Sequence, residues 1–155
     1  MAQKLTSHKS RLKRSILLIG LDAEEKGLLG ARHFTEHPIV DLENIITMIN
    51  MDMIGRMKDS SATAGGVGTS PMFNPLLDSL SKNRGFNLNM TLPGFGPSDH
   101  AVFYAKDIPV LFFFSGFHNE YHTPDDTWKL INLQGEKDIL ELIYDIVFHL
   151  ARTCL

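Results

Sequence analysis

The sequence is poor in cysteine and in long apolar runs, and each shortage excludes a class of protein. Its single cysteine, Cys154, cannot form an intramolecular disulfide or build a thiolate metal cluster, and so near the C-terminus it is no credible nucleophile. The apolar runs are far shorter than the ~20 residues that a membrane-spanning helix needs, and none follows the basic N-terminus as in a signal peptide. The compartment in which the protein works therefore stays unknown.

An excess of positive charge is also lacking, since 15 Lys and Arg stand against 18 Asp and Glu. Nucleic acids and anionic membranes attract strongly basic surfaces, so the balance indicates neither as a partner and favours small molecules or peptides. The segment 1–14 is basic and has no acidic residue, but a solvated helix end explains it better than a targeting or nucleic-acid segment. With 155 residues, 43% of them hydrophobic, the chain suffices for one domain with a sizeable core.

Short apolar runs alternate with helical patterns along the chain. The runs that predict buried strands are 16–21, 45–49 and 110–114. The segments that predict helices are 27–34, 73–80, 100–108 and 136–152. Residues 60–71, rich in Ser, Gly and Thr, are expected to form a loop. This alternation predicts an α/β fold with a mixed, largely parallel sheet flanked by helices.

Acidic residues follow the predicted strands, where open α/β sheets place their sites. Glu24 and Glu25 come after the first run, Asp52 after the second, and His122 lies in the polar segment after the third. Neighbouring carboxylates repel each other unless a cation shares them, and carboxylates with imidazoles bind divalent ions without any thiolate. In a metallohydrolase the remaining carboxylate, Glu24, would take a proton from water.

These residues also have purely structural interpretations. A glutamate pair at the start of a helix complements the helix dipole, and His122 fits a turn in which the backbone satisfies its ring. Asp52 is harder to explain in this way, because an acid between Met51 and Met53 needs a partner. A serine hydrolase is disfavoured: Ser98-Asp-His has the residue types of a triad, but adjacent residues rarely converge and no Gly-x-Ser-x-Gly elbow precedes them.

Five motifs, taken in order, carry a family resemblance. They occupy residues 14–31, 50–53, 97–100, 108–114 and 121–127 and read RSILLIGLDAEEKGLLGA, NMDM, PSDH, IPVLFFF and YHTPDDT. In order and approximate spacing they resemble the dinuclear-zinc aminopeptidases, a family that includes bacterial leucyl aminopeptidase and the glutaminyl cyclases. Each motif alone is weak, whereas five in sequence make chance agreement improbable.

The resemblance implies a zinc-dependent metallopeptidase of the zinc-exopeptidase fold that removes N-terminal residues from peptide or aminoacyl substrates. By this resemblance Glu24 is the general base, Glu25 and His122 bind one zinc ion, and Asp52 binds the second. The residues expected beside these ligands or near the substrate are Asp99, His100 and Tyr121. Two alternatives stay open: a non-catalytic binding module on the same fold, and acyl transfer like that of a glutaminyl cyclase.

The same resemblance implies ligands that this sequence lacks. The family places a His-x-Asp motif and a bridging Asp before the Glu-Glu pair, and neither occurs among the 23 residues that precede Glu24. We therefore expect residues 1–155 to be the C-terminal part of a single catalytic domain, without its N-terminal portion. Such a chain is expected to bind one zinc ion weakly at most, to have little or no activity alone, and to self-associate through an exposed sheet edge.

Overall fold

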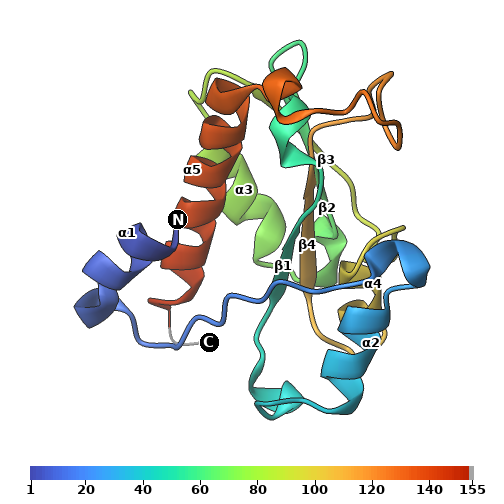
Figure 1. The fold of residues 1–155 in the computed structure, drawn as a ribbon. Coiled ribbons are helices and arrows are strands. Elements are labelled where there is room, and N and C mark those ends of the chain that lie inside the picture. The colour runs from blue at the N-terminus through green and yellow to red at the C-terminus, as the bar shows by residue number, and fades with distance from the viewer. Residues whose placement is uncertain (154–155) are drawn as a thin grey trace.

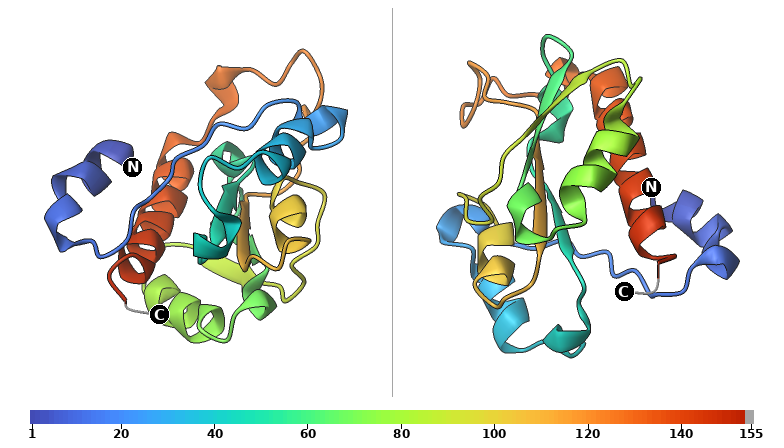
Figure 2. Two further views of the ribbon diagram at one scale, coloured as in Figure 1. Left: turned by 90° about the horizontal axis from the view of Figure 1, so that it is seen from below. Right: turned by 180° about the vertical axis from the view of Figure 1, so that it is seen from behind.

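The computed structural model describes residues 1–153, which form three layers (Figure 1). Helices α3 (Phe73–Ser81) and α5 (Leu133–Leu150) cover one face of a central sheet, and α2 (Leu29–Glu36) and α4 (His100–Tyr104) cover the other (Figure 2). Helix α1 (Ala2–Ser7) lies beside α5. Cys154, expected to take no part in catalysis, lies outside the described residues.

Within residues 1–153 four strands form one mixed sheet. They are β1 (Met48–Met51), β2 (Ser61–Gly65), β3 (Asn87–Met90) and β4 (Val110–Phe114), in the spatial order β1-β4-β2-β3. Strand β4 is parallel to β1 and antiparallel to β2, and β2 is parallel to β3. This arrangement confirms the predicted α/β fold with a mixed, largely parallel sheet. It also places β1 and β3 at the two edges of the sheet.

Two clusters of buried apolar side chains hold the layers together. The larger lies between the sheet and helices α3 and α5, and its fully buried members include Leu77, Leu111, Phe113, Ile139, Leu142, Ile143 and Ile146. The smaller lies between the sheet and helices α2 and α4 and is formed by Ala31, Phe34, Phe103, Ile108 and Val110. Burying each large side chain contributes about 1.5–3 kcal/mol, so these contacts fix the strands whose ends carry the polar residues.

Helix α5 confirms the helix that the apolar periodicity of residues 136–152 predicts. Its buried aliphatic residues Ile139, Leu142, Ile143, Ile146 and Leu150 follow the three- and four-residue spacing of one helix face, whereas Tyr144 contacts the α1 region. The helix begins at Leu133, before the predicted start at 136, because the Asn132 side chain accepts a hydrogen bond from the Gly135 amide at 2.9 Å and caps it. No helix among residues 1–153 is both long and apolar enough to cross a membrane.

The apolar segment 16–21 is not the buried strand that its composition predicts. It is extended but pairs with no strand in the described part of the chain, and Leu17, Leu18 and Ile19 are 47%, 52% and 42% exposed. A strand needs a neighbour that accepts and donates its backbone hydrogen bonds. Apolar composition therefore predicts a strand that does not form here, since the described residues supply no such neighbour.

The segment 60–71 is not only a loop, as its composition suggests, because it contains β2. Small residues suit this position, since Ala64 pairs with Phe113 in the neighbouring strand β4. At Gly66, where φ is +78°, an added Cβ would lie 2.2 Å from the Val110 carbonyl oxygen. The chain thus approaches β4 more closely than any side chain permits. The small residues that suggest a loop are therefore the ones that this close packing requires.

Candidate metal and active site

A closed turn carries Glu24 and Glu25 between the extended segment and helix α2. The Gly30 amide donates a hydrogen bond to the Asp22 carbonyl oxygen at 2.9 Å, which joins the two ends of the turn. An added Cβ at Gly30 would lie 2.5 Å from that oxygen, so the closure requires glycine. As predicted, both glutamates lie on a connection that leads into a helix.

Asp52 follows β1, and a short chain of hydrogen bonds sets its orientation. The Ser98 hydroxyl donates to Oδ2 of Asp52 at 2.8 Å, and the Asn50 amide group donates to the Ser98 oxygen at 2.7 Å. Ser98 is only 2% exposed, so water competes little for these bonds. Ser98 therefore orients a carboxylate instead of acting as a nucleophile. The sequence gives no signal of this contact, because Ser98 and Asp52 lie 46 residues apart.

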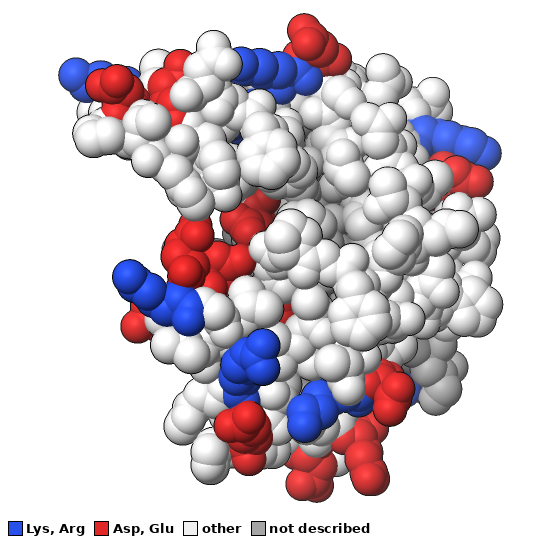
Figure 3. All heavy atoms as spheres, turned by 90° about the vertical axis from the view of Figure 1, so that its right-hand side faces the viewer, with Lys and Arg blue, Asp and Glu red and all other residues white. Residues whose placement is uncertain are grey.

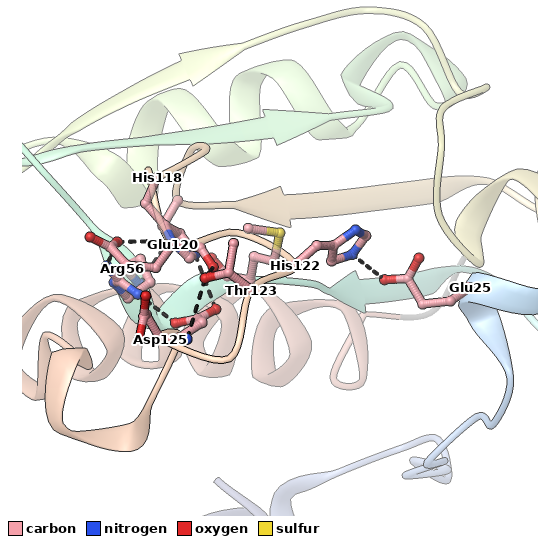
Figure 4. Close-up of polar contacts among 10 residues, drawn as sticks. Glu25, Arg56, His118, Glu120, His122, Thr123 and Asp125 are labelled. Carbon is pink, nitrogen blue, oxygen red and sulfur yellow. Dashed lines mark hydrogen bonds and ion pairs between the residues drawn. The ribbon is translucent and has the colours of Figure 1, made fainter.

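The polar segment after β4 is a loop, residues 116–127, that brings His122 to the Glu25 turn (Figure 4). Nε2 of His122 lies 2.7 Å from Oε1 of Glu25, although the two residues are 97 positions apart. The ring of Tyr121 stacks on the His122 ring, with 3.8 Å between their centroids. Burial, followed by the negative charges of Glu25, Asp52 and Glu24, raises the pKa of Tyr121. The loop and the turn thus form two sides of one site.

Left-handed backbone conformations occur at each of the three segments that form the site. They are found at Ala23, which precedes Glu24, at Met53, which follows Asp52, and at His122 itself, with φ angles of 55°, 52° and 58°. Such conformations cost about 1–3 kcal/mol at residues other than glycine and cluster at functional sites. The same conformation also occurs outside these segments, at Asp59, Ser60, Asn83 and Asp107, so it does not by itself mark the site.

Acidic side chains gather in a hollow on the face that carries this loop and turn (Figure 3). Burial raises the pKa of Glu24, and the charges of Glu25, Asp52 and Asp99 raise it further, whereas His122 lowers it. Glu24 therefore lies within electrostatic reach of the other predicted site carboxylates. A carboxyl group whose pKa is raised in this way suits proton transfer near neutral pH.

Asp99 and His100 lie at the start of α4 and are buried, with 8% and 2% exposure. The His100 ring stacks on Phe112, with centroids 4.4 Å apart. Burial raises the pKa of Asp99, with a further contribution from Asp52, and lowers the pKa of His100 to about 4. In residues 1–153, Oδ1 of Asp99 and Nδ1 of His100 have no hydrogen-bond partner. The predicted contact of both residues with substrate or ligands stays a prediction.

The donors of this site fit zinc in kind but are too few for a complete site. Across residues 1–153, no three His, Cys, Asp or Glu side chains form a group that could hold a metal ion. Glu25 and His122 meet, but Asp52 does not join them in such a group. Carboxylate oxygen and imidazole nitrogen are ordinary zinc ligands, and catalytic zinc takes three from the protein. The weak binding of one zinc ion at most stays a prediction.

The family follows from a match along most of the sequence. The model described as Peptidase family M28 matches residues 1–147. This chain belongs to peptidase family M28. The match spans the Glu24 turn, the end of β1 and the His122 loop, and it confirms the resemblance that the five motifs carry. A comparison with curated protein sequences finds no match.

Solved structures agree with this M28 assignment. The chain is 26% identical to the LapA aminopeptidase of Legionella pneumophila, with a TM-score of 0.75 over 93% of this chain and 41% of LapA. LapB of the same organism gives 20% identity and a TM-score of 0.80 over 98% and 44%. BSAP, a zinc aminopeptidase from Bacillus subtilis, is 22% identical, with a TM-score of 0.71 over 86% of this chain and 35% of BSAP. At these identities LapB and BSAP show the fold alone. The chain spans less than half the length of each of these structures.

The buried His100 predicts that stability depends on pH. Its pKa is about 4 in the folded chain against 6.5 for an exposed histidine, so between these values the unfolded state binds the extra proton. The contribution of His100 to the free energy of unfolding therefore rises with pH across this window by about 3 kcal/mol, whereas the raised pKa values of Glu24 and Asp99 act in the opposite direction. Replacing His100 with Phe keeps a ring beside Phe112 and should flatten this rise, measured by urea denaturation between pH 4 and 6.5.

The matched control is His149→Gln, because His149 is exposed near the end of α5. This variant should keep the slope of the unmodified chain. An unchanged slope in His100→Phe would contradict the assignment of the pH dependence to His100.

Proposed function

We propose that this chain is the C-terminal part of the catalytic domain of a zinc-dependent aminopeptidase, which hydrolyses N-terminal peptide bonds of peptide or aminoacyl substrates. The observation that carries the proposal is the 2.7 Å contact between Glu25 and His122, which joins two motifs from opposite ends of the chain. Membership of peptidase family M28 and the similarity to the LapA aminopeptidase support the same activity.

In this proposal Glu25 and His122 hold one zinc ion, and Asp52 contributes to a second. When bound, zinc supplies the Lewis acidity that polarises the scissile carbonyl and makes a water molecule easier to deprotonate. The Ser98 hydroxyl donates a hydrogen bond to one carboxylate oxygen of Asp52 and leaves the other oxygen for the metal ion. The first ion thus has two protein ligands, Glu25 and His122, and the second has only Asp52. Catalytic zinc takes three ligands from the protein, so these residues alone hold zinc weakly.

Glu24 is proposed as the general base. It takes a proton from the attacking water and passes it to the leaving amine, which completes hydrolysis without net loss or gain of protons. Burial and neighbouring carboxylates raise its pKa, which brings the proton affinity of Glu24 closer to that of the groups it serves. Asp99, His100 and Tyr121 are proposed to support this group or to border the substrate.

Zinc titration of the purified chain tests the proposed ligands. We expect one zinc ion at most, bound weakly, and we expect Glu25→Gln and His122→Gln each to abolish this binding, because each removes one of the two donors that meet. His149→Gln changes an exposed histidine near the end of α5 and is the matched control, which should leave zinc binding unchanged. Isothermal titration calorimetry measures the affinity and number of ions. Tight binding of two ions would contradict the incomplete site.

Substitution of Glu24 tests the proposed chemistry in a protein that carries the whole catalytic domain of which this chain is proposed to be a part. Glu24→Gln should lower kcat for an aminoacyl p-nitroanilide by about 10²–10⁴-fold, because a general base is lost, while the zinc content stays the same. An unchanged rate would favour a non-catalytic module. If the unmodified protein releases no N-terminal residue from any such substrate, the proposed activity is wrong, and cyclisation of an N-terminal glutaminyl peptide would instead indicate acyl transfer.

We also propose that the chain self-associates through an exposed edge of its sheet, to which the exposed apolar segment 16–21 adds apolar surface. Strands β1 and β3 end the sheet, and the extended segment with Leu17, Leu18 and Ile19 leaves apolar side chains in solvent. Size-exclusion chromatography should show a species larger than a monomer that grows with concentration, and Leu18→Lys should reduce it. A monomer at every concentration would refute this.

A further inference from the structure

A cluster of charged side chains lies at the base of loop 116–127, apart from the proposed ligands (Figure 4). The Arg56 cluster consists of Arg56, His118, Glu120 and Asp126. Nη2 of Arg56 lies 2.6 Å from Oε2 of Glu120, and Nη1 lies 2.5 Å from Oδ1 of Asp126. One guanidinium thus binds two carboxylates, which the planar fork of arginine permits.

In the Arg56 cluster the two basic side chains are removed from water, whereas the two carboxylates are partly exposed. The side chains of Arg56 and His118 are 12% and 2% exposed, and those of Glu120 and Asp126 are 32% and 36% exposed. Nδ1 of His118 lies 3.3 Å from Glu120, and its Nε2 lies 3.4 Å from Asp126. Charged pairs in such a place are screened less than exposed pairs. The buried guanidinium is therefore screened less from its two carboxylates than it would be in a fully exposed ion pair.

The backbone of Arg56 is tied to the sheet on the side of Asp52. The Arg56 amide donates a hydrogen bond to the Ser115 hydroxyl at 3.1 Å, and the Ser115 amide donates to the Met53 carbonyl oxygen at 3.3 Å. Arg56 follows Asp52 by four residues, and Ser115 directly follows β4. Arg56 therefore lies at the edge of the sheet where β1 and β4 end.

Glu120 and Asp126 stand on either side of His122 in the sequence, and both ends of this stretch are held by Arg56. Inside the loop the backbone bonds are local, such as that from the Thr123 amide to the Glu120 carbonyl oxygen at 3.0 Å. Residues 122–130 are exposed, so this part of the loop has little apolar packing against the rest of the protein. The position of His122 relative to the sheet thus depends on the charged cluster together with the ring of Tyr121, which stacks on His122 and contacts Phe117 and His118.

We propose that Arg56 is a positioning residue that holds the His122 loop against the end of β1, so that His122 faces Glu25 and lies on the same side as Asp52. The effect of this position on zinc binding rests on the function proposed above, whereas the effect on the loop does not. Without the guanidinium, Glu120 and Asp126 would repel each other in a half-buried place, and the loop would move into solvent.

Amide hydrogen exchange of the metal-free chain, with zinc titration, tests the positioning role. Arg56→Gln should speed exchange in residues 116–127 about tenfold and lower zinc affinity about tenfold, as loss of a group that supports a ligand does. Arg56→Lys keeps the charge but not the fork, so both effects should be smaller. Arg84→Gln is the matched control, because Arg84 pairs with Asp145 of α5 away from the loop, and it should leave both measurements unchanged.

The outcomes separate this proposal from the proposed function. Faster exchange confined to 116–127 supports the positioning role even if the unmodified chain binds no zinc, a result that counts against the proposed function instead. Unchanged exchange in Arg56→Gln overturns the positioning role. Where the unmodified chain does bind zinc, faster exchange with unaltered zinc affinity overturns the claim that the cluster positions His122. If Arg56→Gln does not fold, Glu120→Gln removes one contact while keeping the guanidinium and faces the same criteria.

Discussion

The parallel pairing of β1 with β4 is the constraint on which the site depends. Parallel strands bring their carboxyl ends to the same edge of a sheet, so the residues that follow them become neighbours without any contact of their own. Asp52 follows β1, and its amide donates to the Phe113 carbonyl oxygen of β4 at 3.1 Å. The loop that carries His122 leaves β4 at the same edge. Both predicted ligands therefore reach the site through the sheet.

The contact between Glu25 and His122 is a result of this arrangement and not its cause. Their side chains are 66% and 54% exposed, and ion pairs so exposed contribute about 0–1 kcal/mol. So weak a contact cannot bring together two segments that are 97 residues apart. The Gly30 closure positions one partner and the Arg56 cluster the other, and the buried layers of α5 and β4 support both.

The sequence indicates those parts of this molecule whose signals are local. The periodicity of α5 and the apolar run of β4 depend on neighbouring residues, and both elements are found where they were predicted. The acidic positions after the apolar runs also stand in short motifs, which is why the Glu25–His122 pair could be anticipated. The strand predicted at 16–21 is absent, and β2 lies in a predicted loop, because strand formation depends on a partner that composition does not reveal.

The side chains that support the site were not predictable for the same reason. Ser98 reaches Asp52 and Arg56 reaches Glu120 across 46 and 64 residues, and no spacing in the sequence connects them. Ser98 even stands in a motif whose residue types suggest a nucleophile. Only the fold shows that its hydroxyl orients a carboxylate. Local patterns thus locate candidate ligands, whereas the residues that hold them emerge from the packing of distant segments.

Two groups of carboxylates lie close to the same loop, and their charges are balanced differently. The hydrogen bond from Arg56 is the main cause that lowers the pKa of Glu120, so this carboxylate already has its cation. Burial and then the charges of Glu25, Asp52 and Asp99 raise the pKa of Glu24, and only His122 opposes them. A group of acids that the protein leaves unneutralised gains most from an external cation. The two groups therefore differ in charge balance, because the carboxylates of the Arg56 cluster pair with a guanidinium, whereas His122 is the one charge that opposes those acting on Glu24.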